Sequence, residues 1–244
     1  WWLGYPSSSS NSLAGGLIGA GLLAVGGDHI NWGLEALARG ELSGAAKVVA
    51  GLVFSPLFGF LAGFLLMKFI LHGFARFHRR VESLFVASQY LSVAWLGFSH
   101  GANDAQKGMA IIGMMLLASG HTERFQVPDW AVVLCAGAIT LGTMFGGWRI
   151  IRTLGFGLYR LRVVHSVANQ LAAALVNSLA TAIGAPTSTT QVVTATLVGN
   201  GAAEKPGHVH WRTVGGIVAG WWFNLPASML LGWGYAWLYL ASRS

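Results

Sequence analysis

Residues 184–201 read GAPTSTTQVVTATLVGNG, and residues 4–21 read GYPSSSSNSLAGGLIGAG, which aligns with them without a gap. The two stretches share a glycine and a proline, four hydroxyl residues in a row, one amide residue and glycines spaced along an apolar segment. Self-similarity at a fixed spacing is the signature of a structural repeat. The sequence therefore predicts two copies of one unit, and a weaker echo between AGLVFSP at 50–56 and AGWWFNLP at 219–226 extends it.

The two polar stretches are predicted to be helix N-termini. Proline and hydroxyl residues are favoured in the first turn of a helix. Free N–H groups and hydroxyls at the positive end of a helix dipole form a neutral cradle for an anion. A serine-rich segment at a chain end is more often a linker, but the second copy lies between apolar segments. The candidate substrate-binding residues are Ser7, Ser8, Ser9, Ser10, Thr187, Ser188, Thr189 and Thr190.

The composition indicates a polytopic membrane protein. Of the 244 residues, 54% are apolar and only 9% are charged, far from the profile of a soluble domain. Nearly uncharged windows of about 20 residues suffice to cross a bilayer as helices. The clearest spans are 45–71, 130–147, 167–184 and 214–240, the last with a tilt or a kink at Pro226, and a shorter apolar run covers 13–25.

Charge in the loops predicts the orientation in the membrane. Loops 72–83 and 148–165 are basic, whereas loops 26–46 and 119–129 are mostly acidic. The positive-inside rule places the basic loops in the cytoplasm, so residues 84–118 must cross an odd number of times. The net charge of +7 is explained by this orientation. Binding to nucleic acid would need a clustered basic surface instead.

Residues 97–113, GFSHGANDAQKGMAIIG, place polar side chains inside an apolar stretch. Ionisable residues at membrane depth mark functional sites by default. The plain alternative is a short surface loop with a helix cap at Asp104. Because Gly101 and Gly108 would permit a break, we expect 84–118 to be a broken helix or a pair of re-entrant halves.

If residues 103–107 are helical, Asn103, Gln106 and Lys107 share a face and Asp104 can pair with Lys107. A carboxylate that accepts a proton or a small cation suits cotransport of an anion with a cation. Asp104 is therefore the candidate ion-coupling residue, together with Asn103, which is also a candidate substrate-binding residue. Possible accessory residues are His100, Gln106, Lys107, Asn177, Asn11 and Gln191.

The remaining polar residues are weak candidates. Asn169, Gln170 and Asn177 either join helices or line a cavity, and Asn177 is the better candidate because it is closer to the second turn. His208 and His210 have no third ligand nearby in the sequence, so no metal site is predicted. The sequence contains none of the common hydrolase, zinc-protease or phosphate-loop motifs, so we predict neither an enzyme nor catalytic residues.

SHGANDAQKGMAIIG, GYPSSSSNSLAGGLIGAG and GAPTSTTQVVTATLVGNG closely resemble motifs of the inorganic phosphate transporter (PiT) family. This resemblance implies two inverted repeats, each with an A-N-D signature and a serine-threonine turn, around phosphate and a coupling ion. Asn103 and Asp104 match the signature. The A-Q-K at 105–107 is similar to the bacterial branch, which implies coupling to protons over sodium and a divalent metal travelling with phosphate. Asn11 and Gln191 stand where relatives often have histidine, and an amide does not titrate near neutral pH.

We therefore expect an all-α, inverted-repeat transporter that is N-terminally incomplete. Residues 1–26 would end the first repeat, 27–83 would hold a loop, a span and a basic loop, and 84–244 would form the second repeat. The expected function is symport of phosphate with a cation by alternating access, without a cofactor, in the plasma membrane, with the bacterial inner membrane favoured. A homodimer is one of the assemblies that we consider for it. The alternatives are a symporter of sulfate or another tetrahedral oxyanion, an anion channel, and a membrane scaffold.

Overall fold

The computed structural model describes residues 4, 6–73 and 80–243, and every regular element within them is a helix. The predicted all-α class is confirmed. The elements are α1 (Ser9–Ala24), η1 (Gly27–His29), α2 (Leu34–Ala38), α3 (Gly44–Gly73), α4 (Arg80–Ala118), α5 (Asp129–Phe145), α6 (Trp148–Gly157), α7 (Val163–Ala182), α8 (Thr189–Glu204), η2 (Pro206–His208) and α9 (Trp211–Ala241). Arg76 and Arg79 of the first basic loop lie outside the described residues.

The apolar helices fit a membrane protein. α3, α7 and α9 are each long and apolar enough to cross a bilayer, and α5 with α6, bent by 62° at a short break, would make a fourth span. Phe58, Phe69 and Leu230 on α3 and α9 are more than half exposed, and such outward-facing apolar side chains are favoured where lipid is the solvent. The four predicted spans correspond to α3, α5, α7 and α9, and α9 continues through Pro226 as one helix.

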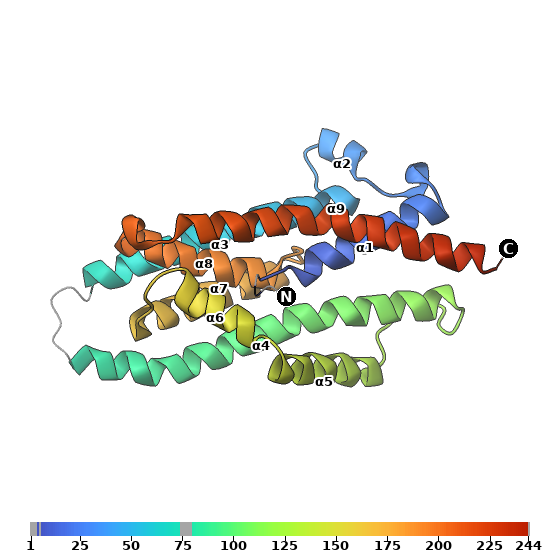
Figure 1. Cartoon of the computed structure of the whole chain (residues 1–244). Coiled ribbons are helices and arrows are strands. Elements are labelled where there is room, and N and C mark those ends of the chain that lie inside the picture. The colour runs from blue at the N-terminus through green and yellow to red at the C-terminus, as the bar shows by residue number, and fades with distance from the viewer. Residues whose placement is uncertain (1–3, 5, 74–79, 244) are drawn as a thin grey trace.

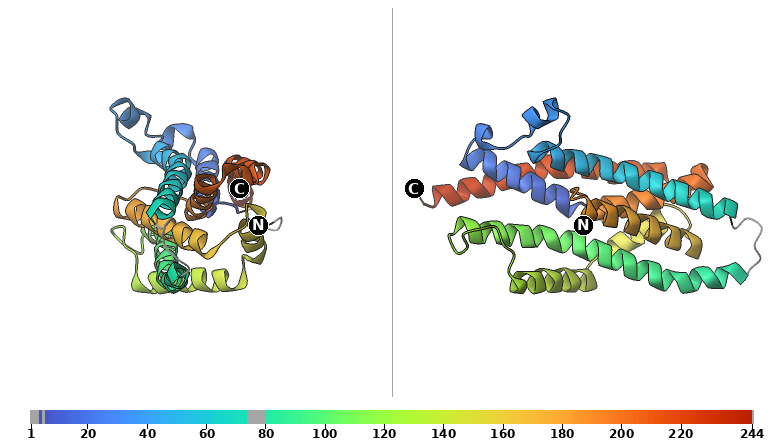
Figure 2. Two further views of the ribbon diagram at one scale, coloured as in Figure 1. Left: turned by 90° about the vertical axis from the view of Figure 1, so that its left-hand side faces the viewer. Right: turned by 180° about the vertical axis from the view of Figure 1, so that it is seen from behind.

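Two half-length helices begin near the middle of the molecule and run in opposite directions. α1 runs toward the end that holds the C-terminus, and α8 runs toward the other end (Figures 1 and 2). The long helices α4 and α9 extend along most of the molecule, whereas α3 lies beside α8 and stops short of the end that holds the C-terminus. α1 packs along α9, whereas α8 packs along α3 and α7. Each half-helix is thus held by a span from the other part of the chain.

Matched glycines allow this close packing. A Cβ atom at Gly19 of α1 would lie 1.9 Å from the carbonyl oxygen of Met229 in α9. A Cβ atom at Gly199 of α8 would lie 2.2 Å from the carbonyl oxygen of Phe60 in α3. Gly19 and Gly199 are equivalent positions of the sequence repeat. Small residues that let backbones touch are a general means of packing helices in membranes.

The predicted break in residues 84–118 is wrong, because α4 continues without interruption from Arg80 to Ala118. Gly101 and Gly108 both lie within the helix. A break is unnecessary because His100, Asp104 and Lys107 lie one turn apart and contact one another, so their charges are satisfied sideways while the backbone keeps its helical hydrogen bonds.

The second basic loop also differs from the prediction. Residues 148–165 contain the ten-residue helix α6 and the start of α7, and only 158–162 connect them. Trp148, Ile151 and Phe156 of α6 are exposed, while Arg149 and Arg152 lie on the same short helix. Exposed apolar side chains therefore alternate with arginines along this short helix.

Candidate functional site

Each polar turn ends in a serine that caps the following helix. The hydroxyl of Ser8 accepts the N–H of Asn11 at 3.1 Å, and the hydroxyl of Ser188 accepts the N–H of Gln191 at 3.4 Å. Both serines have extended backbones, as N-cap residues do. The predicted helix N-termini are therefore present at both copies of the repeat.

The prolines do not lie in the first helical turn, contrary to the prediction. Pro6 and Pro186 precede the caps by two residues, and they follow Gly4 and Gly184, whose φ angles are +82° and +62°. That backbone conformation strongly favours glycine. The glycine therefore redirects the chain, the proline stiffens the approach, and the serine caps the helix.

The two caps contact each other at the centre of the molecule. The Oγ atoms of Ser8 and Ser188 are 2.8 Å apart. The Asn11 side-chain amide donates to the carbonyl of Trp221 at 3.2 Å, so its oxygen accepts the Ser8 hydroxyl at 3.0 Å. Because a hydroxyl carries one proton, Ser188 is the donor to Ser8. The positive ends of two helix dipoles thus meet at one place.

Helix α4 brings the A-N-D residues to this place. Lys107 Nζ donates to Asp104 Oδ1 at 2.5 Å, and His100 Nε2 lies 3.2 Å from Oδ2. The hydroxyl of Thr189 lies 3.1 Å from each carboxylate oxygen. The expected pairing of Asp104 with Lys107 is present. The Asp104 side chain is only 10% exposed, so the second turn meets a carboxylate largely removed from water.

The sequence had suggested a cradle made only of neutral groups, but a charged side chain reaches it. Lys107 Nζ also donates to Ser10 Oγ at 2.7 Å, and Ser10 Oγ donates to the carbonyl oxygen of Thr187 at 3.1 Å. An ammonium group is therefore hydrogen-bonded to the first turn while it pairs with Asp104. We define Ser8, Ser10, Asp104, Lys107, Ser188 and Thr189 as the central cluster.

Asn103 joins the same helix to the tip of the α7–α8 hairpin. Its side-chain amide donates to the hydroxyls of Thr187 at 3.0 Å and Thr181 at 3.1 Å. Thr181 in turn donates to the backbone carbonyl of Asn177 at 2.9 Å. The side chain of Asn177 is fully buried, and within the described part of the chain neither of its polar atoms has a hydrogen-bond partner.

Some predicted residues lie apart from the central cluster. Gln106 is exposed and has no described contact with the central cluster, although it lies three residues after Asn103 on the same helix. At 3.6 residues per turn, positions 106 and 107 are about 100° apart around the helix. Ser7 and Ser9 are exposed on the surface of the first turn, where their hydroxyls are open to a ligand.

Two residues of α9 that the sequence had not singled out hold the first turn in place. Asn224 donates its side-chain amide to the carbonyl oxygen of Ser8 at 2.8 Å, and the Trp221 indole donates to the carbonyl oxygen of Pro6 at 2.9 Å. The Ser12 hydroxyl also donates to Asn224 Oδ1. The echo of AGWWFNLP at 219–226 was the available signal, but its polar residue was not connected to the turn.

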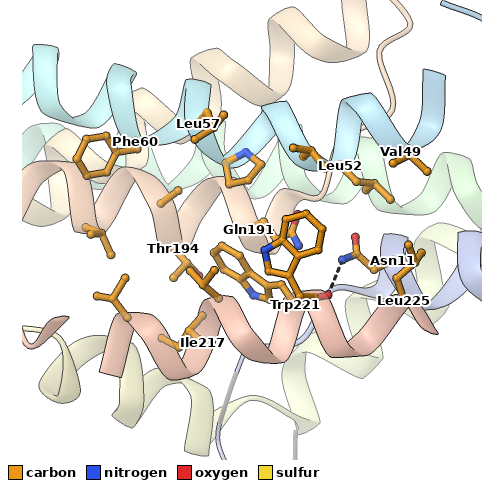
Figure 3. Close-up of a pocket in the computed structure, with 17 residues that line it drawn as sticks. Asn11, Val49, Leu52, Leu57, Phe60, Gln191, Thr194, Ile217, Trp221 and Leu225 are labelled. Atoms are coloured by element: carbon orange, nitrogen blue, oxygen red, sulfur yellow. Dashed lines mark hydrogen bonds between the residues drawn. The ribbon is translucent and has the colours of Figure 1, made fainter. Parts of the chain in front are cut away.

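A cavity of about 460 Å³ lies behind the turns and is distinct from the central cluster (Figure 3). Apolar side chains of α3, α8 and α9 form most of its walls, including Leu52, Phe60 and Ile217. Asn11 and Gln191 contribute to its wall, and Asn11 points toward the Trp221 carbonyl (Figure 3). Such walls suit hydrocarbon, whereas a hydrated anion needs donors. This cavity therefore offers few of the donors that a hydrated anion needs.

A second polar cluster closes the other end of the α7–α8 hairpin. Glu204 at the end of α8 pairs with Arg162 and with His165 Nε2, the latter at 2.7 Å. His165 Nδ1 accepts the backbone N–H of Arg162 at 3.0 Å, so Nε2 carries the proton that is donated to Glu204. Burial raises the pKa of the neighbouring Tyr159, and the charge of Glu204 acts in the same direction. Its neutral hydroxyl donates to the carbonyl of Leu197.

Comparison with known proteins gives a consistent result. The profile of the Phosphate transporter family matches residues 1–78 and 72–232. A probable low-affinity inorganic phosphate transporter of Rhizobium meliloti (strain 1021) is 38% identical over 95% of this chain and 67% of its own length. The proteins of the same name from Bacillus subtilis (strain 168) and Mycobacterium tuberculosis (strain ATCC 25618 / H37Rv) are 34% and 37% identical over 95% of this chain, and over 67% and 54% of their own lengths.

The fold also has a solved counterpart. A structure described as the sodium-dependent phosphate transporter superposes with a TM-score of 0.79, covering 98% of this chain and 74% of that one. The sequence identity is 22%. The similarity therefore concerns the arrangement of the helices.

Proposed function

This chain belongs to the phosphate transporter family, and we propose that it moves inorganic phosphate across a membrane together with a cation, by alternating access around the central cluster. The observation that carries the proposal is the meeting of α4 with both turns. Asp104 binds Thr189 of the second turn, and Lys107 binds Ser10 of the first. A movement that separates the turns would change both contacts at once.

The charge of the site favours an anion. The ammonium of Lys107 balances the carboxylate of Asp104, so the pair adds no net charge. Two helix N-termini remain, each equivalent to about half a positive charge. Their sum is close to one positive charge in a place that is largely shielded from water. Half-helix ends that point at an anionic substrate near the membrane midplane are a recurrent device in transporters.

The turns offer the donors that phosphate requires. Helix N-termini leave backbone N–H groups without a partner in the helix, and the flanking residues are Ser7, Ser9 and Thr190, which are exposed or half-buried. Hydroxyl and N–H donors can replace the water around a tetrahedral anion. We assign phosphate binding to both turns and to Asn103, which positions Thr187.

The coupling ion in this proposal is a proton, in preference to sodium. His100 is the titratable group beside Asp104, at 3.2 Å, and its side chain is 38% exposed. A proton shared by His100 and Asp104 would weaken the pairing of Asp104 with Lys107 and free the ammonium for phosphate.

The wider assignments follow from the same family. The homologues are named as transporters or permeases, which implies a transport role instead of an enzymatic one. We place the chain in the plasma membrane of a bacterium, with residues 1–26 and 84–244 as parts of two inverted repeats joined by 27–83. A homodimer and a divalent metal that accompanies phosphate remain proposals.

The test is uptake of labelled phosphate by cells that produce the Asp104→Asn variant in the complete protein. We expect uptake to fall at least about 100-fold, because the amide can neither accept a proton nor balance Lys107. Glu123→Gln in the exposed loop after α4 is the matched control and should leave uptake unchanged. Normal uptake by Asp104→Asn at equal membrane abundance would refute the proposal. If sulfate inhibits the uptake of labelled phosphate as strongly as unlabelled phosphate does, the assignment of the substrate would change.

A further inference from the structure

Both carboxylate oxygens of Asp104 already have donors beside them. It accepts Lys107 Nζ at 2.5 Å and lies 3.2 Å from His100 Nε2, and the Thr189 hydroxyl is shared between both oxygens at 3.1 Å. A carboxylate offers about four acceptor positions, and three donors face them here, one of which is shared between both oxygens. A metal cation binds through oxygen lone pairs, so it could reach Asp104 only by displacing one of these donors.

Lys107 does more than neutralise its neighbour. Its ammonium also donates to Ser10 Oγ at 2.7 Å, and Ser10 reaches the backbone of the second turn through Thr187. The Lys107 side chain is 22% exposed, so the ion pair is mostly sheltered from water. An ammonium group has three donors. Two are used here, and the third is free to meet an anion held between the turns.

We propose that Lys107 is a tethered counter-cation, whose ammonium stands at Asp104 where a free metal cation such as sodium would otherwise bind. The inference rests on the proposed function only in taking phosphate as the anion at the turns. Lys107 and Asp104 are three residues apart on one helix, so the ammonium has a high effective concentration at the carboxylate. Sodium must compete with it. Phosphate therefore binds at this cluster without a sodium requirement.

An ordinary structural ion pair would not have the same consequence. A pair that only satisfied buried charge could lie anywhere along α4, and its loss would weaken the fold in every medium. Lys107 instead contacts the turn that carries the substrate residues. Its removal should leave Asp104 charged, sheltered and partly unpaired, which creates a site for a small cation. The variant should thus acquire a response to sodium that the parent lacks.

The first experiment measures the thermal unfolding of the purified protein in detergent, in sodium chloride and in choline chloride at equal ionic strength. The parent should unfold at the same temperature in both salts. Lys107→Gln should unfold at a temperature about 2 °C or more higher in sodium, because a cation that binds only the folded state stabilises it. Asp104→Asn/Lys107→Gln removes the carboxylate as well and should lose this response.

The matched control is Lys68→Gln, which removes an exposed lysine of α3. It should show no sodium response. If Lys107→Gln cannot be purified in choline, its recovery when sodium is present throughout purification supports the proposal. A folded Lys107→Gln protein that ignores sodium, a variant that fails in both salts, or a parent that is stabilised as strongly as the variant overturns it.

The second experiment measures equilibrium binding of inorganic phosphate to the same proteins. The parent and Lys107→Arg should bind equally with and without sodium. Lys107→Gln should bind about 10- to 100-fold more weakly in choline, the usual effect of losing a charge-assisted hydrogen bond, and sodium should restore part of the loss. Equal binding by Lys107→Gln in choline counts against the inference. Absence of phosphate binding by the parent would refute the proposed function, while the unfolding experiment would still test the cation site.

Discussion

Gly199 of α8 allows a close approach between that helix and α3, so its replacement by alanine is a direct test of the packing. The added Cβ would lie 2.2 Å from the carbonyl oxygen of Phe60 and 2.9 Å from the backbone N of Phe64, whereas ordinary contact begins at 3.4 Å. The two backbones must therefore separate by about 1.2 Å. Overpacking costs about 1–3 kcal/mol, and a clash with backbone on both sides belongs at the upper end of that range.

Alanine also gains about 1 kcal/mol over glycine through helix propensity. The net destabilisation of Gly199→Ala should therefore be about 2 kcal/mol. For a chain of this length that corresponds to a fall of roughly 4–8 °C in the unfolding temperature, measured in detergent. Gly97→Ala in α4 is the matched control, because a Cβ there meets nothing within 4 Å. Its unfolding temperature should stay the same or rise. Equal unfolding temperatures for the two variants would refute the backbone-contact explanation.

Three further variants test other parts of the structure. Ser188→Ala removes a helix cap and the hydroxyl that donates to Ser8. The variant should lose about 1 kcal/mol of stability in thermal unfolding and bind phosphate more weakly. Unchanged binding would argue against a role of this cap in the site. Asn177→Leu replaces a buried amide whose polar atoms lack partners among the described residues. The variant should unfold at a higher temperature, equivalent to about 1–3 kcal/mol, yet take up less phosphate. Normal uptake would mean that Asn177 has only a structural role. Glu204→Gln weakens the pairing with His165 at the open end of the α7–α8 hairpin. The variant should be less stable by about 1–3 kcal/mol. An unaltered melting curve would mean that apolar packing alone closes the hairpin.

The sequence predicted the elements whose signals are local. The spans follow from apolar runs, and the two turns follow from a repeat that preserved the glycine, the serine cap and the amide beside it. The pairing of Asp104 with Lys107 followed from helical spacing alone.

The errors arose where a long-range contact decides the outcome. α4 was expected to break because a polar motif flanked by glycines interrupts its apolar pattern, but Thr189 and Ser10 reach these polar residues from distant parts of the chain. The contact of Lys107 with Ser10 also places an ammonium in a cradle that seemed neutral. Asn224 was overlooked because its partner, the carbonyl of Ser8, lies more than 200 residues away. Spacing along one helix cannot reveal such partners.

The exchanged packing of the half-helices has a consequence for how the protein is made. α1 precedes the helix it packs along, α9, by about 200 residues of the chain. Contacts of such sequence separation form late and slowly. Until residues 211–241 have inserted, α1 and its turn lack the hydrogen bonds that Trp221 and Asn224 make with Pro6, Ser8 and Asn11. Ribosome-bound chains that stop before residue 211 should therefore expose the first turn to water-soluble reagents more than the whole chain does, and the turn should be fully held only once α9 has inserted.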